Sequence, residues 1–482
     1  MKLSRYASLD AVAIAELTNS GEIHPSEFLR AAHAACDEVN PDLNAVIELY
    51  DPETVQTCAR GPLAGVPFLA KDLGAGEAGR RQEMGSRLAR GRVCSVESHY
   101  YGRMKTAGVQ VLGRATASEF GVSGSSSNLL HGTTANPWDV TRNAGGSTGG
   151  GAAAVAAGIV PMVQASDGGG SIRGPASFCG LVGLKPSRGR VSHGPGGRDP
   201  LLGLVQQLVL CRTLRDAATA LDVLSGYHAG DPYGIQTPRQ PFMNELSCRT
   251  EVMRIGVARS AWGEVSPDPE ILDVIEDVTA ALSKLGHRIE DIDPPYSPEN
   301  YTDLLWGLAG LGAMETSLLA REMDRAIGPE TLDPVNLKLY EAGLSQTARD
   351  TFNALEGAGA IRSDVARAFE GFDLWITPTM PMLPFGHGSK YCQTNETVSA
   401  REWFDLDCSM HQYLGVFNAT GNPCISLPLG QSSGGLPIGI QLVAPFACED
   451  RLLRMARDLE DCFPWSQRRP AVHVSPRPCQ SI

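Results

Sequence analysis

Hydrophobic and polar positions repeat with two periods along the chain, and the period changes many times before residue 378. Apolar residues spaced three or four apart predict amphipathic helices, whereas short apolar runs bounded by Gly, Pro or polar residues predict strands. The predicted helices are 9–17, 25–39, 152–157, 214–224, 269–285, 303–327 and 345–369. The predicted strands are 46–50, 67–72, 109–113, 160–165, 254–258, 288–293 and 372–377. The alternation of the two kinds of element predicts an α/β protein.

Three further segments carry loop composition. Residues 226–241 are rich in Gly and Pro and predict a connecting loop, and residues 387–398 are polar and predict a mobile loop. The tail after Pro464 is rich in Arg and Pro. We therefore expect no regular element in the two loops.

The charge balance limits the classes of partner. The chain has 482 residues with 41 Lys and Arg against 54 Asp and Glu, a formal net charge of −13. Such a surface repels the phosphates of nucleic acids and anionic lipids. The longest small and apolar run, 152–163, is shorter than the roughly 20 residues needed to span a bilayer, and the N-terminus has no apolar signal core. We expect a cytoplasmic protein that binds neither nucleic acid nor membrane.

The cysteines and histidines carry no metal or disulfide pattern. The twelve cysteines are scattered, and the nearest two in sequence, Cys448 and Cys462, are far from Cys-x-x-Cys spacing. No two of the ten histidines have the spacing of a common zinc site. We expect free, mostly buried thiols and neither a metal nor another cofactor.

Candidate chemistry lies in two glycine-rich segments and one lysine. Ser147 lies within 145–151, Ser171 lies within 167–173, and Lys71 ends a predicted strand. A serine hydroxyl becomes a good nucleophile when a base removes its proton, and a buried, neutral lysine can be that base. Glycine-rich backbone can direct several amides at one developing negative charge. This trio predicts a hydrolase.

The segment from Gly145 to Ser192 resembles the amidase signature family. The resemblance continues upstream at Asn136-Pro137-Trp138 and downstream at 417–423 and 435–443. It implies an α/β/α fold with a large central mixed β-sheet covered by helices on both faces. It also implies one domain over residues 1–482, with a catalytic core at about 60–195 and the rest of the sheet and the pocket helices in 196–482.

The resemblance implies a Ser-Ser-Lys triad. Ser171 would be the nucleophile that forms an acyl-enzyme, Ser147 the relay serine usually held in a cis peptide, and Lys71 the base. The other implied site residues are the oxyanion-hole amides of Gly168, Gly169, Gly170 and Ser171, the supporting pair Asp167 and Arg173, and the substrate contacts Gly124, Ser125, Ser126 and Thr148. Thr148, Ser166 and Gly168 depart from the usual family pattern.

The implied activity is cofactor-independent hydrolysis of a small-molecule carboxamide. The stretches 426–444 and 449–470 are particularly similar to 6-aminohexanoate cyclic dimer hydrolases, so cyclic or linear aminohexanoate-type amides and aryl amides are the expected substrates, and the resemblance allows a homodimer. A second candidate is the glutamine-hydrolysing subunit of a tRNA-dependent amidotransferase, but segment 123–128 departs from that subunit's surroundings. A non-catalytic binding protein of the same fold would not need Lys71, Ser147 and Ser171 together.

Three other interpretations of single motifs are weaker. Gly145-x-Ser147-x-Gly149 matches the nucleophile elbow of α/β-hydrolases, with His193 or His228 as base, and Gly149-x-Gly151-x-x-Ala154 mimics a dinucleotide fingerprint. Both patterns require an apolar strand directly before them, and residues 139–144 are too polar. Cys179 could be a nitrilase-type nucleophile, but a small buried residue is its simpler role.

Overall fold

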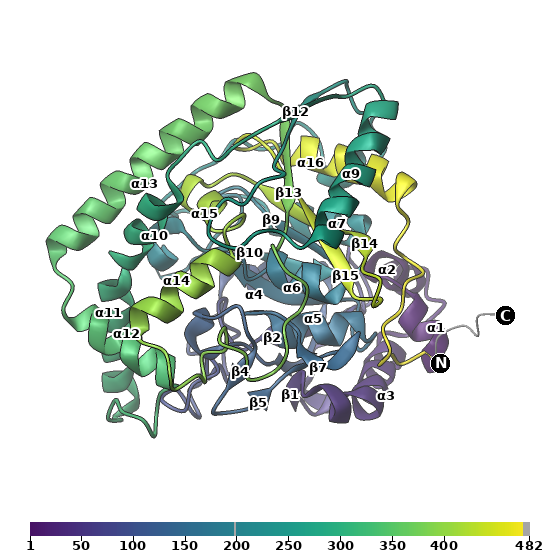
Figure 1. Ribbon diagram of the computed structural model, residues 1–482. Helices are drawn as coiled ribbons and strands as arrows, with labels where there is room; N and C mark the ends of the chain where they lie inside the picture. The colour runs from purple at the N-terminus through teal and green to yellow at the C-terminus, as the bar shows by residue number, and fades with distance from the viewer. Residues whose placement is uncertain (197–198, 476–482) are drawn as a thin grey trace.

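The computed structural model describes residues 1–196 and 199–475. Its centre is an eleven-stranded sheet in the order β1-β3-β2-β8-β10-β9-β14-β15-β13-β11-β12 (Figure 1). The strands of this sheet are β1 Val46–Leu49, β2 Pro67–Lys71, β3 Gln110–Ala115, β8 Met162–Asp167, β9 Val182–Lys185, β10 Gln206–Cys211, β11 Arg254–Val257, β12 Arg288–Asp291, β13 Leu374–Pro378, β14 Cys424–Gln431 and β15 Pro437–Val443. Two small ribbons pair β4 Ser127–Asn128 with β5 Gly132–Thr133 and β6 Ala135–Asn136 with β7 Asp139–Asn143.

Helices cover the sheet, and the predicted layered α/β architecture is confirmed (Figure 1). Helix α5 packs against α6. Helix α7 belongs to a second group, in which it packs against α4, α8 and α16. The helices are α1 Leu3–Ser8, α2 Ala11–Asn19, α3 Pro25–Leu43, α4 His99–Ala107, α5 Gly149–Ala156, α6 Arg173–Cys179, α7 Leu214–Leu224, α8 Phe242–Glu245, α9 Pro269–Lys284, α10 Pro298–Trp306, α11 Ala309–Met323, α12 Pro334–Leu344, α13 Ala348–Ala368, α14 Ala400–Met410, α15 Val416–Thr420 and α16 Glu449–Cys462.

Local sequence explains the element ends well in the strand-helix-strand unit β11-α9-β12. The Asp268 side chain accepts a hydrogen bond from the Glu270 amide and caps α9, and Pro269 occupies the first helical turn. The helix ends just before Gly286, whose φ is +94°. Strands β11 and β12 are parallel neighbours, as a crossover through one helix requires.

The predicted helix 303–327 is wrong as a single element. Two helices, α10 and α11, meet at Gly307 instead. A Cβ at Gly307 would lie 3.0 Å from the Asp350 carbonyl oxygen and 3.1 Å from the Ala354 Cβ, so the break lies where a glycine packs closely against α13. The sequence pattern also predicts none of the helices α4, α6, α8, α12, α14, α15 and α16, and none of the sheet strands β9, β10, β14 and β15. The loops 226–241 and 387–398 contain no helix or sheet strand, although Cys392 and Gln393 in the second loop are buried.

The strand order fixes the position of the candidate chemistry. Strand β2 is parallel to its neighbour β8, with Phe68 opposite Met162 and Leu69 opposite Val163. The carboxyl ends of parallel neighbours meet at one edge of the sheet. Lys71 ends β2 and Asp167 ends β8, so the fold brings the predicted base to the start of the nucleophile segment.

The cysteines and the helix lengths of the described residues bear on two predictions from the composition, those about thiols and about membrane spans. All eleven cysteines in residues 1–196 and 199–475 are free, and six of them are buried. Within those same ranges, no helix combines the length and the apolar character that crossing a bilayer would require. The predicted tail lies partly outside the described residues, because its last seven positions, 476–482, are not described.

Candidate active site

Lys71 is a buried lysine at the end of a fully buried strand. Its side chain is 2% exposed, and burial lowers the pKa of its amine to about 7, while the Asp167 carboxylate acts in the opposite direction. A lysine in such a position is a mixture of charged and neutral amine at neutral pH. Lys71 is therefore able to take a proton from a neighbouring hydroxyl.

Two hydroxyl groups contact the Lys71 amine. Nζ lies 2.8 Å from Ser147 Oγ and 2.9 Å from Ser166 Oγ. The Ser166 carbonyl oxygen is a weaker third neighbour at 3.3 Å. The contact with Ser147 was expected from the family resemblance. The contact with Ser166 was not, although Ser166 directly precedes Asp167 in the sequence.

Ser147 lies in the segment between β7 and α5. The Gly146–Ser147 peptide bond is cis, as the family resemblance implied. The Ser147 side chain is buried, and its carbonyl accepts a hydrogen bond of 3.3 Å from the Ser118 amide. A Cβ at Gly146 would lie 2.5 Å from the Ser123 carbonyl oxygen, so glycine is needed for this close approach. The hydroxyl is thus held against Lys71 by backbone on two sides.

The nucleophile segment combines glycines with unpaired amides. Gly168 and Gly169 are partly exposed, and Gly170 has a φ of +145° that side-chain-bearing residues rarely adopt. Within residues 1–196 and 199–475, the backbone amides of 168–171 donate no hydrogen bond. Neighbouring free amides are the arrangement that an oxyanion requires.

Ser171 is partly exposed and lies two residues before Arg173, the first residue of α6. In the described part of the chain its hydroxyl makes no hydrogen bond, so Ser147 and Lys71 are joined but Ser147 and Ser171 are not. Catalytic hydrogen bonds are often long in an enzyme without substrate and shorten in the complex. The role of Ser171 as nucleophile therefore stays a prediction.

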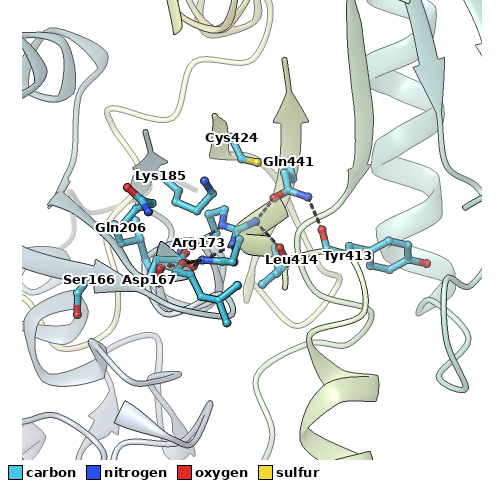
Figure 2. Close-up of polar contacts among 12 residues, drawn as sticks. Ser166, Asp167, Arg173, Lys185, Gln206, Tyr413, Leu414, Cys424 and Gln441 are labelled. Carbon is cyan, nitrogen blue, oxygen red and sulfur yellow. Dashed lines mark hydrogen bonds and ion pairs between the residues drawn. The ribbon is translucent and has the colours of Figure 1, made fainter. Parts of the chain in front are cut away.

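Asp167 and Arg173 form a buried ion pair around this segment (Figure 2). Arg173 Nε donates to Asp167 Oδ2 and Nη2 donates to Oδ1, both at 2.9 Å. Arg173 also donates to the Leu414 carbonyl, to Gln441 Oε1 and to Asn418 Oδ1. Burial alone would raise the pKa of Asp167, but Arg173 holds it well below its usual range. Both ends of the glycine segment are therefore fixed to the sheet.

The four predicted substrate contacts lie close to Ser147. The hydroxyl of Ser126 donates to the Gly145 carbonyl at 2.7 Å and accepts from the Gly149 amide at 3.0 Å. The Ser125 hydroxyl accepts from Asn143 Nδ2 at 2.9 Å. Both side chains support the Ser147 segment, and Thr148 is buried beside it. Their contact with substrate stays a prediction, as does that of Gly124.

The geometry around Cys179 and Ser147 bears on the weaker interpretations. Cys179 is buried, its Sγ donates to the Ala144 carbonyl, and burial raises the pKa of its thiol, which disfavours the thiolate that a nucleophile needs. Strand β7, directly before the Ser147 segment, pairs with β6 in a two-stranded ribbon outside the central sheet. A nucleophile elbow and a dinucleotide fingerprint both follow a central strand, so neither matches this place.

His411 also lies at the site, and no pattern in the sequence indicates it. It directly follows α14, and a Cβ at Gly124 would lie 2.4 Å from its Cε1 atom, whereas a Cβ at Gly170 would lie 2.8 Å from its Cδ2 atom. The ring is therefore packed between the two glycines. His411 is 240 positions from Ser171 in the sequence, and no spacing rule connects them.

The layered α/β/α fold and the buried contact between Lys71 and Ser147 together define the class of protein, a hydrolase. A protein-family model described as Amidase matches residues 27–453. The chain belongs to the amidase family, and it is a hydrolase of amide carbon–nitrogen bonds.

Individual relatives agree with this membership. The chain is 36% identical to a 6-aminohexanoate-cyclic-dimer hydrolase of Paenarthrobacter ureafaciens, over 96% of both proteins. The solved structure of a 6-aminohexanoate cyclic dimer hydrolase with its substrate superposes with a TM-score of 0.90 at 32% identity, over 97% of this chain and 99% of that one. A glutamyl-tRNA(Gln) amidotransferase subunit of Moorella thermoacetica is 33% identical over 86% of both chains, a more distant match.

Proposed function

We propose that the chain hydrolyses a small-molecule carboxamide through an acyl-enzyme on Ser171, with Ser147 as proton relay and Lys71 as base. The observation that carries this proposal is the 2.8 Å contact between the Lys71 amine and the Ser147 hydroxyl. It is supported by the lowering of the Lys71 pKa to about 7 through burial.

The steps follow from these groups. Neutral Lys71 accepts a proton from Ser147 as Ser147 accepts one from Ser171, and the Ser171 oxygen bonds to the amide carbon. Amides of residues 168–171 would stabilise the oxyanion. The carbon–nitrogen bond then breaks as Ser147 returns a proton to the departing amine. Water adds to the ester by the same relay and releases the carboxylic acid and Ser171.

The proposed substrates are cyclic or linear aminohexanoate-type amides, or aryl amides. The names of two relatives support the aminohexanoate-type amides. The curated relative that matches over 96% of this chain and the solved structure that matches over 97% of it are both named for the 6-aminohexanoate cyclic dimer. A glutamine-hydrolysing subunit is the second candidate, and its more distant match ranks it lower. Co-purification with partner subunits distinguishes the two.

We further propose one domain, a cytoplasmic location and a homodimer. A single sheet with strands drawn from residues 46 to 443 supports one domain. Free thiols at all eleven described cysteines support a reducing compartment. Light scattering of the purified protein tests the dimer.

The test is acyl-enzyme trapping with Ser171→Ala. Wild-type protein is mixed with cyclic dimer, linear dimer or a 4-nitroanilide, quenched in acid and weighed as intact protein. We expect an added acyl mass on the wild type and none on the variant, whose kcat should fall about 10⁴-fold or more. The exposed Ser363 gives the matched control Ser363→Ala, which should retain full activity. Normal turnover by Ser171→Ala would overturn the proposal.

A further inference from the structure

The ring of His411 packs between two glycines, one directly before Ser171 and one beside the Gly146–Ser147 peptide. Gly124 and Gly170 leave room for the ring that no Cβ would allow. Gly170 precedes Ser171 directly, and the backbone of 123–125 lies against the Gly146–Ser147 peptide. The imidazole thus packs against the residue that precedes Ser171 and, on its other side, against Gly124, whose backbone lies against Gly146.

The hydrogen bonds of His411 define the direction of its two nitrogens. Nδ1 lies 2.9 Å from the Asp407 carbonyl oxygen and 3.2 Å from the Asp407 carboxylate. Because a carbonyl oxygen only accepts, Nδ1 carries a hydrogen. Asp407 Oδ1 in turn accepts from the Gly124 amide at 3.2 Å. Asp407 therefore holds the His411 ring and the Gly124 backbone in place relative to each other.

The second nitrogen, Nε2, is left for another partner. Within the described part of the chain it makes no hydrogen bond, and the side chain is 11% exposed. With Nδ1–H committed to Asp407, the neutral ring offers a lone pair at Nε2, and the charged ring offers an N–H donor. The charge state of His411 therefore decides what Nε2 binds.

The surroundings favour the charged ring. Burial would lower the pKa of His411, but Asp407 raises it above its ordinary value, with a smaller contribution from Asp167. The ring also lies at the C-terminal end of α14, where the helix dipole stabilises a cation. Among the charged groups of the packed elements, Asp167 is already paired with Arg173. The 123–126 segment has no ionisable side chain.

We propose that His411 Nε2–H binds an oxygen acceptor of the substrate, a carboxylate or a second carbonyl close to the amide that is cleaved. This inference rests on the proposed function and makes His411 a specificity-determining residue of it. Amides whose acyl chain ends in oxygen are then preferred over amides that end in a methyl group. The alternative is that the ring only fills the space between Gly124 and Gly170.

The experiment compares three 4-nitroanilides of one chain length, ending in a carboxylate, a primary carboxamide or a methyl group. His411→Asn retains a donor near the Nδ1 position and removes the one at Nε2, whereas His411→Gln places an N–H close to the position of Nε2. The exposed histidine His387, which contacts the Val140 carbonyl, gives the matched control His387→Asn. Thermal melting verifies that each variant is folded.

We expect His411→Asn to raise KM about tenfold for the two oxygen-ended substrates and to leave the methyl-ended substrate unchanged, as the loss of a hydrogen bond to a charged group implies. His411→Gln should recover most of this loss for the carboxamide-ended substrate. In wild type, the preference for the carboxylate-ended over the methyl-ended substrate should fall as pH rises and the ring loses its charge. Titration of Lys71 affects both substrates equally and cancels in this ratio.

Equal changes for all three substrates, a loss in kcat alone, or no change would overturn the role of His411. If wild type cleaves neither these three amides nor the cyclic and linear dimers, the proposed function fails, and the contact is then tested by calorimetry in the Ser171→Ala background. There, weaker binding of the carboxylate-ended compound by the His411→Asn, Ser171→Ala double variant supports the inference. Equal binding by the single and double variants overturns it.

Discussion

Two buried lysines occupy equivalent places in neighbouring parts of the sheet. Lys71 ends β2 and Lys185 ends β9, and both side chains are almost fully enclosed. Burial lowers the pKa of Lys71 to about 7 and that of Lys185 to about 8. Figure 2 shows Lys185 beside the Asp167 and Arg173 pair. By pKa and burial alone, either amine qualifies as a base.

Their partners differ, and the difference is chemical. Lys71 Nζ contacts the hydroxyls of Ser147 and Ser166, which can donate a proton to a neutral amine. Lys185 Nζ contacts the carbonyl oxygens of Pro186 at 3.0 Å and Asn422 at 2.6 Å. Carbonyls only accept hydrogen bonds, so they hold N–H groups and supply no proton. A lowered pKa therefore identifies a candidate base, and the neighbouring groups determine whether it can act.

The largest expected effect is the loss of the Lys71 amine. Lys71→Met fills a similar volume and removes the base, so kcat should fall about 10³-fold or more, the upper part of the range for general-base catalysis. The same change removes a desolvated amine, so the midpoint of urea unfolding should not fall. Steady-state rates with a 4-nitroanilide measure kcat, and urea titrations measure the midpoint of unfolding. Retained activity would move the role of base away from Lys71.

The second effect is the pH dependence of kcat/KM. Lys71 acts as a base in its neutral form, and burial lowers its pKa to about 7, so activity should rise with pH and reach half its maximum near pH 7. Below that point the rate should fall about tenfold per pH unit. The methyl-ended 4-nitroanilide keeps His411 out of the measurement. A midpoint near pH 8 would instead assign the limiting titration to a group with the pKa of Lys185.

Much of this site could be predicted from the sequence because it depends on local composition. The strand at 67–72, the glycines at 145–151 and 167–173 and the order of their elements are all written in short segments. The structure has β2 at Pro67–Lys71 and β8 at Met162–Asp167, with the predicted Asp167 at a strand end. The parallel pairing of β2 with β8, which the sequence does not predict, then brings Lys71 to the nucleophile segment.

The remainder depends on tertiary packing. His411 reaches the site because α14 ends beside Gly124 and Gly170, and no local pattern encodes that approach. The break between α10 and α11 lies where Gly307 packs closely on α13, a contact that the apolar periodicity of 303–327 does not indicate. The partners of Lys185 are likewise invisible in sequence, because Asn422 is 237 positions away.

A smaller effect should come from the second hydroxyl at Lys71. Ser166→Ala removes the 2.9 Å contact with Nζ, so the amine is held less firmly toward Ser147 and kcat should fall about tenfold with KM unchanged. Ser166→Thr retains a hydroxyl and should recover most of the rate. Because Ser166 acts through Lys71, adding Ser166→Ala to Lys71→Met should cause no further loss. An additive loss would contradict this positioning role.

The smallest expected effect on activity comes from the second lysine. Lys185→Met should leave kcat/KM within about twofold, since Nζ contacts only the carbonyls of Pro186 and Asn422 among the described residues. The effect of Lys185 should instead appear in the pH dependence of the free energy of unfolding. Burial lowers the pKa of Lys185 to about 8 in the folded chain, and the unfolded value is about 10.4. Between these values the unfolded chain binds more protons, so Lys185 makes stability rise with pH by up to about 1.4 kcal/mol per unit.

That contribution is measurable as a difference between two proteins. The free energy of urea unfolding of wild type relative to Lys185→Met should increase between pH 8 and pH 10, because the cost of burying a charged Lys185 amine is complete below pH 8 and is relieved above it. Other titrating groups are shared by both proteins and cancel. A constant difference across this range would mean that Lys185 keeps an ordinary pKa. A large loss of activity with normal stability would mean that contact with carbonyl oxygens does not prevent a buried lysine from acting as a base.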